Sequence, residues 1–379
     1  MSTSPARESH GRDAELALIR AELERLSDGA ETVLIVEGAA GMGKSRLLAE
    51  VSTIARSLGI RVGSSAADPS ETVVELAVLL AALFDGAEPL LDDSGLAVLQ
   101  AHPEQRFWLL RDLQQLLERA ALESPLLISI DDAHWADGGT AAAIRTLPMR
   151  LVGLPIAWVI ALRPPRESTT LVQALEKLQQ RGARKIVLGP LDENAIAQLA
   201  TDVLAAQPDQ SILEQLTEAD GNPFLVVETL LGLQEERRIR FVDGRAELID
   251  NRLPRRVQQK MRERLGRLSD EASDAATVAA SLGRTFSFDD LARTLGRPAS
   301  DLLAPVGELL ETNLLVERDE KLAFWHDITR EAVRASVPVT ARRALDRQAA
   351  GVLLEAGALP VEVAVQLAAS AERGDEVAI

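Results

Sequence analysis

Residues Gly38 to Ser45 (GAAGMGKS) match the pattern GxxxxGK[ST] of a phosphate-binding loop. Glycines let backbone N–H groups curl around phosphate oxygens without a Cβ in the way. Lys44 can supply positive charge to the β and γ phosphates, and the Ser45 hydroxyl can ligate Mg²⁺. The alternative is a glycine-rich turn without a ligand. Because every fixed position matches, we predict a nucleotide site that includes the loop residues Gly38, Gly41, Met42, Gly43, Lys44, Ser45 and Arg46.

Two carboxylates follow an apolar run, in the pattern of a Walker B strand. Residues 125–130 (PLLISI) lead directly into Asp131 and Asp132. Asp131 would hold Mg²⁺, directly or through water, so Ser45 and Asp131 are the metal candidates. Asp132 lies where a water-activating carboxylate is needed. The alternative is a buried strand that ends in an ordinary Asp-containing turn.

A basic residue follows another apolar run, Leu154 to Leu162. Arg163 would point toward the edge where α/β sheets bind ligands, at the carboxyl ends of the strands. A surface charge before Pro164 is the alternative. We therefore predict a catalytic set of Lys44, Asp131, Asp132 and Arg163.

The elements around these residues predict the fold class. A β-branched run (residues 33–36), the loop and a helical segment that stops before Gly59 read as strand, loop and helix. Repeated alternation of strands and helices predicts an α/β P-loop NTPase domain with a parallel sheet in three layers. Helical, winged-helix and helical-repeat-like segments should follow, with two hairpins. The expected divisions are a tail (1–9), the nucleotide-binding domain (10–166), a helical domain (167–236), a winged-helix domain (237–335) and the start of a TPR-like arm (336–379).

Composition restricts the class of protein. A chain of 379 residues should hold several domains. The absence of cysteine excludes a disulfide scaffold and fits a cytoplasmic protein. The apolar runs are too short to span a membrane, so we expect no membrane partner. The net charge of −17 opposes general attraction to nucleic acid. Direct DNA binding would depend on a few basic residues that read equally as a solvated helix face: Arg255, Arg256, Lys260 and Arg262.

The order of motifs resembles one family. The chain looks like the nucleotide-binding core of a STAND signalling ATPase, of the kind found in large LuxR-type (LAL) bacterial transcription activators. The segments that carry the resemblance are Gly11-Arg12-Asp13, the phosphate loop, IDDAHWAD (130–137), ALRPPR (161–166), GPL (189–191), GNPF (221–224) and FWHDITREAV (324–333).

The resemblance implies further roles. Gly11 and Arg12 lie where the adenine pocket begins, and Arg163 looks like the sensor arginine near the γ-phosphate. Pro223 resembles a proline that packs on adenine in related NOD-like receptors. His326 resembles their histidine that touches the β-phosphate of ADP and holds the closed state; the alternative is a core histidine, with Asp327 as a helix N-cap. For the pair His134-Trp135 we expect only a packed loop.

We therefore expect an ATP/ADP-dependent switch that controls a transcriptional regulator. Hydrolysis should be slow, because Asp132 is one methylene shorter than the Glu usual in AAA-type ATPases. ATP is preferred over GTP because no NKxD-type motif is visible. The alternative is a non-catalytic scaffold that holds ADP. Further expected partners are an unknown inducer or protein and, depending on nucleotide, a second copy of the chain. The relatives continue into helical repeats and a helix-turn-helix, so DNA contact is expected only through a C-terminal domain beyond residue 379.

Overall fold

The computed structural model describes residues 9–28, 32–68, 75–92, 106–164, 170–250, 252–312, 314–358 and 363. Two compact units divide the chain, Met1–Gly189 and Pro190–Ile379. Each unit has its own buried core, so each is described by itself.

The first unit is built on a parallel sheet of five strands, in the order β2-β3-β4-β1-β5. Its members are runs of apolar residues, and all seven residues of β4 are buried. This confirms the predicted α/β P-loop NTPase fold. The strands are β1 (Thr32–Gly38), β2 (Arg61–Ala66), β3 (Leu126–Asp131), β4 (Ile156–Leu162) and β5 (Arg184–Leu188).

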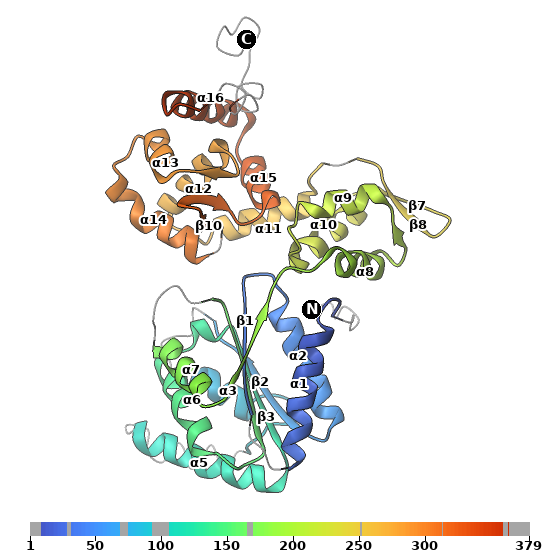
Figure 1. Ribbon diagram of the computed structural model, residues 1–379, viewed down its shortest axis with the longest axis vertical. Helices are drawn as coiled ribbons and strands as arrows, with labels where there is room; N and C mark the ends of the chain where they lie inside the picture. Colours follow the sequence, from blue (N-terminus) through green and yellow to red (C-terminus); the bar gives the residue numbers. More distant parts are fainter. Residues whose placement is uncertain are drawn as a thin grey trace, which may run out of the picture. The chain divides into compact units, whose positions relative to one another are not determined.

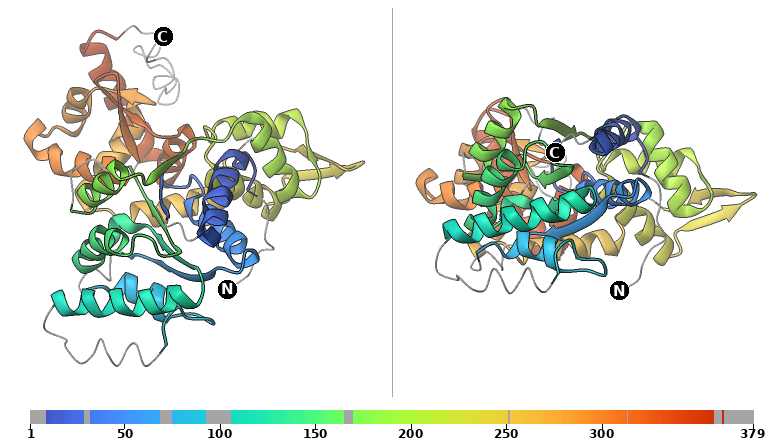
Figure 2. Two further views of the ribbon diagram at one scale, coloured as in Figure 1. Left: turned by 60° about the horizontal axis from the view of Figure 1, so that its bottom comes forward. Right: turned by 90° about the horizontal axis from the view of Figure 1, so that it is seen from below.

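Helices cover both faces of the sheet (Figure 1). The blue helices α1 (Asp13–Glu24), which a short 3-10 turn η1 (Arg25–Asp28) follows, and α2 (Lys44–Ser57) lie on one face. The two further views of Figure 2 keep the teal and green helices on the other face. These are α5 (Arg106–Glu123), α6 (Gly138–Arg150) and α7 (Thr170–Gln180), and the light-blue α3 (Ala77–Phe84) shares their core.

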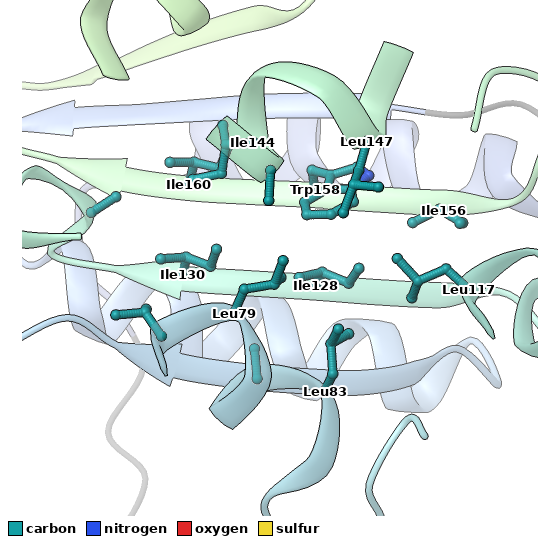
Figure 3. Packing of buried hydrophobic residues seen from close by; sticks show 14 of the residues in the cluster. Leu79, Leu83, Leu117, Ile128, Ile130, Ile144, Leu147, Ile156, Trp158 and Ile160 are labelled. Carbon is teal, nitrogen blue, oxygen red and sulfur yellow. The ribbon is translucent and has the colours of Figure 1, made fainter. Parts of the chain in front are cut away.

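The core between the sheet and the second helical layer is shown in Figure 3. Alternate residues of β3 and β4, such as Ile128, Ile130 and Trp158, meet leucines of α3 and the apolar face of α6. Trp158 is among the largest fully buried side chains. This packing fixes the central strands, and with them the loops that follow their carboxyl ends.

The sheet extends beyond residue 166, where the end of the nucleotide-binding domain was expected. Strand β5 pairs in parallel with β1, from Leu34 opposite Arg184 to Gly38 opposite Leu188. The first unit therefore runs to Gly189. The expected boundary was too early because β5 is a short edge strand whose side chains alternate between exposed and buried, which makes it look isolated among helices.

The second unit begins with three helices, α8 (Glu193–Leu204), α9 (Gln210–Thr217) and α10 (Pro223–Glu235). The expected hairpin at Asp243-Gly244 is confirmed, since β7 (Ile239–Val242) pairs antiparallel with β8 (Arg245–Leu248). It projects from these helices in every view (Figures 1 and 2). A two-residue strand β6 (Gln207–Pro208), which was not expected, adds to β8 in parallel.

The rest of the second unit packs six helices around a small antiparallel sheet of order β10-β11-β9. The second expected hairpin is confirmed by pairing of Leu315 with Phe324. The elements are α11 (Arg255–Leu265), α12 (Asp270–Leu282), β9 (Thr285–Phe286), α13 (Phe288–Leu295), α14 (Ala299–Glu311), β10 (Leu315–Arg318), β11 (Lys321–Phe324), α15 (Asp327–Ser336) and α16 (Val339–Glu355).

Several expectations for this unit stay predictions, namely the divisions at residues 236 and 335 and the winged-helix assignment. Of the expected arm over residues 336–379, residues 359–362 and 364–379 lie outside the described residues. In the part of the chain that the structure describes, no helix is both long and apolar enough to cross a membrane.

Candidate nucleotide-binding site

The strand order brings the predicted catalytic residues to one edge of the sheet. Strand β4 lies between β1, which leads into the phosphate loop, and β3, which ends at Asp131. Glu37 pairs with Leu162, and Ile130 pairs with Ile160. Arg163 therefore follows the strand that separates the loop from the acids. Because the three strands are parallel, their carboxyl ends meet at the ligand-binding edge of the sheet.

The phosphate loop has the backbone that its glycines allow. Gly41 and Gly43 have φ angles of 81° and 88°, a region that favours glycine. Gly43 is the N-cap of α2 and forms no side-chain cap, so the first N–H groups of α2 are not capped by a side chain. Gly38 is needed for another reason: a Cβ there would lie 3.1 Å from the Cβ of Leu188.

Lys44 is buried in this loop. Its Nζ donates hydrogen bonds to the carbonyl oxygens of Gly38 (2.8 Å) and Ala39 (3.1 Å). Burial lowers the pKa of Lys44; Asp132 and Asp131 act in the opposite direction, and Arg163 lowers it further. All four predicted catalytic residues are thus close enough for their charges to interact.

The two acids differ in their surroundings. The backbone N–H of Asp132 donates to Oδ1 of Asp131 at 2.8 Å, which fixes the Asp131 carboxylate. Asp132 has a φ of 46°, a left-handed conformation that few residues other than glycine adopt. This turns the chain from β3 into the short 3-10 helix η3 (Ala133–Trp135).

Arg12 connects three parts of the first unit. Its guanidinium is buried and donates to the carbonyl oxygens of Met42 (3.4 Å) and Gly189 (2.5 Å), and it also pairs with Glu15. Gly11, with a φ of 66°, precedes it. Arg12 therefore fastens the start of α1 to the phosphate loop and to the end of the sheet.

The other three loop residues differ in exposure and contacts. Ser45 is exposed and Met42 is buried, while Arg46 pairs with Glu50 at 3.1 Å.

Among the described residues, no group of three or more His, Cys, Asp or Glu side chains could hold a metal ion by itself. Single oxygen donors such as Ser45 and Asp131 fit Mg²⁺, which usually binds through one or two protein ligands together with phosphates and water.

Asp137 is a structural residue that the sequence analysis missed. It is buried and caps α6, accepting from the backbone N–H of Thr140 (2.8 Å) and from its hydroxyl (2.6 Å). It also accepts from the N–H of Leu76 at 2.6 Å, which joins the start of α3 to the segment behind the acids. The signal was present, because Asp is one of the residues preferred at a helix N-cap.

His134 is half-buried and lies close to the same charges, which the expectation of a packed loop did not anticipate. Burial and then the charges of Arg163 and Lys44 lower its pKa to about 3, while Asp131 acts in the opposite direction. The ring is therefore a neutral imidazole at pH 7.

Pro223 and His326 lie in the second unit, and one residue connects them. Asn222 caps α10, with Pro223 at the first helical position as expected. Its Nδ2 lies 3.0 Å from Nε2 of His326. His326 is 5% exposed, and its pKa is lowered to about 3 by burial and by three arginines, Arg264, Arg284 and Arg318. His326, and not Asp327, is the N-cap residue of α15.

Two of the four basic residues on which DNA contact would depend, Arg256 and Lys260, are engaged in ion pairs. Arg256 pairs with Glu228 (2.8 Å) and Glu235 (2.5 Å), and Lys260 pairs with Glu263 (3.1 Å). These contacts agree with a solvated helix face and give no support to a DNA-binding surface on this helix.

Comparison with known proteins bears out the ATPase assignment. Residues 8–160 match the family model described as an AAA ATPase domain. No curated protein sequence matches the chain. Many solved structures resemble it at low sequence identity, and at that level the likeness shows the fold alone.

Three of these structures illustrate the likeness. The Walker-type ATPase of Pyrococcus abyssi is 16% identical, with a TM-score of 0.52 over 88% of this chain and 99% of that one. The ORC2 protein of Aeropyrum pernix is 15% identical, with a TM-score of 0.52 over 89% and 97%. A STAND protein with a tetratricopeptide repeat sensor from Pyrococcus horikoshii is 16% identical, with a TM-score of 0.36; the match covers 97% of this chain but only 50% of that one. The first unit, with its phosphate loop, tandem acids and strand order, thus has the P-loop NTPase fold, and residues 8–160 are similar to an AAA ATPase domain.

Proposed function

We propose that the chain is an ATP/ADP-dependent switch that hydrolyses ATP slowly and regulates a transcriptional activator. The observation that carries the ATPase part is the charge cluster of Lys44, Asp131, Asp132 and Arg163 at one edge of the sheet. The transcriptional part rests on the resemblance of the motifs to LuxR-type activators. An inducer and nucleotide-dependent self-association belong to the same proposal.

The roles in hydrolysis follow from the chemistry of each group. A water oxygen bonds to the γ-phosphorus while the bond to the bridging oxygen breaks, and its electron pair leaves with ADP. Asp132 accepts the proton of the water. Lys44 and Arg163 balance the charge on the phosphates. Mg²⁺ held by Ser45 and Asp131 would neutralise charge between the β and γ oxygens.

The first experiment identifies the nucleotide that co-purifies and measures single-turnover hydrolysis with Mg²⁺. We expect bound ADP or ATP and slow conversion of ATP to ADP. Firm ADP binding without conversion would favour the alternative, a non-catalytic ADP-holding scaffold. A protein that binds neither nucleotide in calorimetry would refute both.

The switch part rests on the contact between Asn222 and His326, which joins the GNPF segment to the N-terminus of α15. If ADP engages His326 and Pro223, it stabilises the closed state only by its differential affinity for that state. Typical coupling of about 1–3 kcal/mol corresponds to a shift of roughly 5–150-fold.

The test of the switch is His326→Ala. It should weaken ADP more than ATP and shift the small-angle scattering of the ADP-bound protein toward a more open form. Equal loss of both nucleotides, or of neither, with unchanged scattering would make His326 a core histidine.

A further inference from the structure

The imidazole of His134 is partly exposed, but both of its ring nitrogens are buried. Neither Nδ1 nor Nε2 has a hydrogen-bond partner among the groups that the structure describes. Most buried polar atoms in folded proteins have at least one partner, so such an atom calls for an explanation. His326 differs in degree: its Nε2 contacts Asn222 at 3.0 Å, and only its Nδ1 has no partner among the described residues.

The surroundings of His134 are those of the phosphate site. It lies on η3, two residues after Asp132, and its Nδ1 is 3.8 Å from Oδ1 of Asp132. Its charge interactions are with Arg163, Lys44 and Asp131. On one side its ring meets that of Trp135, with the centroids 5.0 Å apart. A histidine that served only to fill the core would not be surrounded by the charged groups of a catalytic set.

A neutral imidazole offers one N–H donor and one lone pair. The separation of 3.8 Å from Asp132 is too long for a hydrogen bond but closes with a small movement of either side chain. Arg163 provides a complementary group, since its Nε is also buried without a partner among the described residues. The anionic acceptor Asp132, the neutral ring of His134 and the cationic donor Arg163 could thus form one continuous series of hydrogen bonds.

We propose that His134 is a positioning residue for hydrolysis: with nucleotide bound, its Nδ1–H holds the carboxylate of Asp132, and its Nε2 accepts from Arg163. This inference rests on the proposed ATPase function and adds a residue to it. The ring stays neutral throughout and transfers no proton. It fixes Asp132 in the orientation that accepts the proton of the attacking water, and it links that orientation to Arg163, which in the proposed function balances the charge on the phosphates. Catalytic hydrogen bonds often tighten only when substrate is bound.

The test compares three variants of the full chain. His134→Asn retains a donor near the position of Nδ1, His134→Gln places an amide near Nε2, and His134→Phe retains only the ring. We measure single-turnover hydrolysis of ATP, the affinity for ADP by calorimetry and the thermal midpoint. We expect the Phe variant to lose at least about tenfold in rate while its ADP affinity changes less than about twofold, since one lost transition-state contact has this size. The Asn variant should recover most of the rate, and the Gln variant less.

A spectroscopic measurement makes the test independent of the rate. The chain has four histidines, so ¹⁵N-histidine labelling gives few ring signals, and His134→Asn assigns one of them. In the wild type, a non-hydrolysable ATP analogue with Mg²⁺ should move the His134 signals to those of a neutral ring with both nitrogens hydrogen-bonded.

Each remaining outcome overturns the proposal. His134 would be a packing residue if the Phe variant kept the wild-type rate or if the Asn variant were no faster than the Phe variant. The same conclusion would follow if all three variants lost ADP affinity and thermal midpoint in parallel. It would also follow if the ring signals did not move with a nucleotide that calorimetry shows to bind. In those cases the ATPase proposal stands. Absence of nucleotide binding by the wild type would instead refute the ATPase proposal and this inference with it.

Discussion

Acid should destabilise the second unit through His326. The ring is neutral in the folded protein, because burial and the charges of Arg264, Arg284 and Arg318 lower its pKa from 6.5 to about 3. The carboxylate that faces it, Asp220, lies 3.8 Å from Nδ1 but is already paired with Arg284 at 2.7 Å. It therefore does little to favour a charged ring.

The direction of the pH effect on stability depends on whether the folded or the unfolded chain binds the proton more readily. Below pH 6.5 the unfolded chain takes up a proton that the folded chain refuses until about pH 3, so stability is complete above 6.5 and is lost as the pH falls. Each pH unit inside this window costs about 1.4 kcal/mol, and the free energy of unfolding should fall by about 2 kcal/mol between pH 7 and pH 5.

The assay compares the wild type with His326→Gln, which has no titrating ring but can still accept a hydrogen bond from Asn222. Urea unfolding at pH 7 and pH 5 is followed by ¹⁹F NMR of 5-fluorotryptophan. Trp325 is the only one of the four tryptophans that lies after Gly189, so its signal reports on the second unit. Every other ionisable group titrates in both proteins and cancels. The variant should lose about 2 kcal/mol less than the wild type. Parallel losses within about 0.5 kcal/mol would refute the assigned shift.

Three further outcomes are expected. Lys44→Ala should lower ADP affinity in calorimetry by more than about tenfold, because a charged donor to phosphate is lost, while the thermal midpoint without nucleotide changes little; unchanged affinity would contradict the loop assignment. Asp131→Asn should abolish Mg²⁺-dependent hydrolysis but still bind ADP, and normal turnover would show that the metal is held elsewhere. Asp137→Ala should destabilise the first unit by roughly 2–4 kcal/mol in urea unfolding, because it removes a helix cap and leaves the N–H of Leu76 without this acceptor; a loss below about 0.5 kcal/mol would contradict its structural role.

The phosphate loop and the strands that lead to Asp131 and Arg163 could be predicted, because each depends on a short stretch of sequence. The phosphate loop needs φ angles that only glycine adopts easily, so Gly41 and Gly43 mark it in the sequence. The apolar runs before Asp131 and Arg163 are long enough to identify as strands. The parallel arrangement then requires that their ends share one edge.

Contacts between distant segments could not be read in this way. The partner of Asn222 is His326, 104 residues later, and neither local sequence predicts the contact with the other. The burial of His134 depends on the neighbouring loops, so its sequence alone indicates only a short turn. The membership of strand β5 in the first sheet depends on hydrogen bonds to β1, more than 140 residues earlier in the chain.

The single side chain of Arg12 has a mechanical consequence. Gly189 is the last residue of the first unit, and the chain crosses to the second unit at the peptide bond that follows it. Arg12 holds the carbonyl of Gly189 and that of Met42 with the same terminal nitrogen, at 2.5 Å and 3.4 Å. One guanidinium nitrogen thus donates both to the phosphate loop and to the last residue of the first unit. A movement of the phosphate loop that displaces the carbonyl of Met42 would therefore act on the same side chain that binds the carbonyl of Gly189.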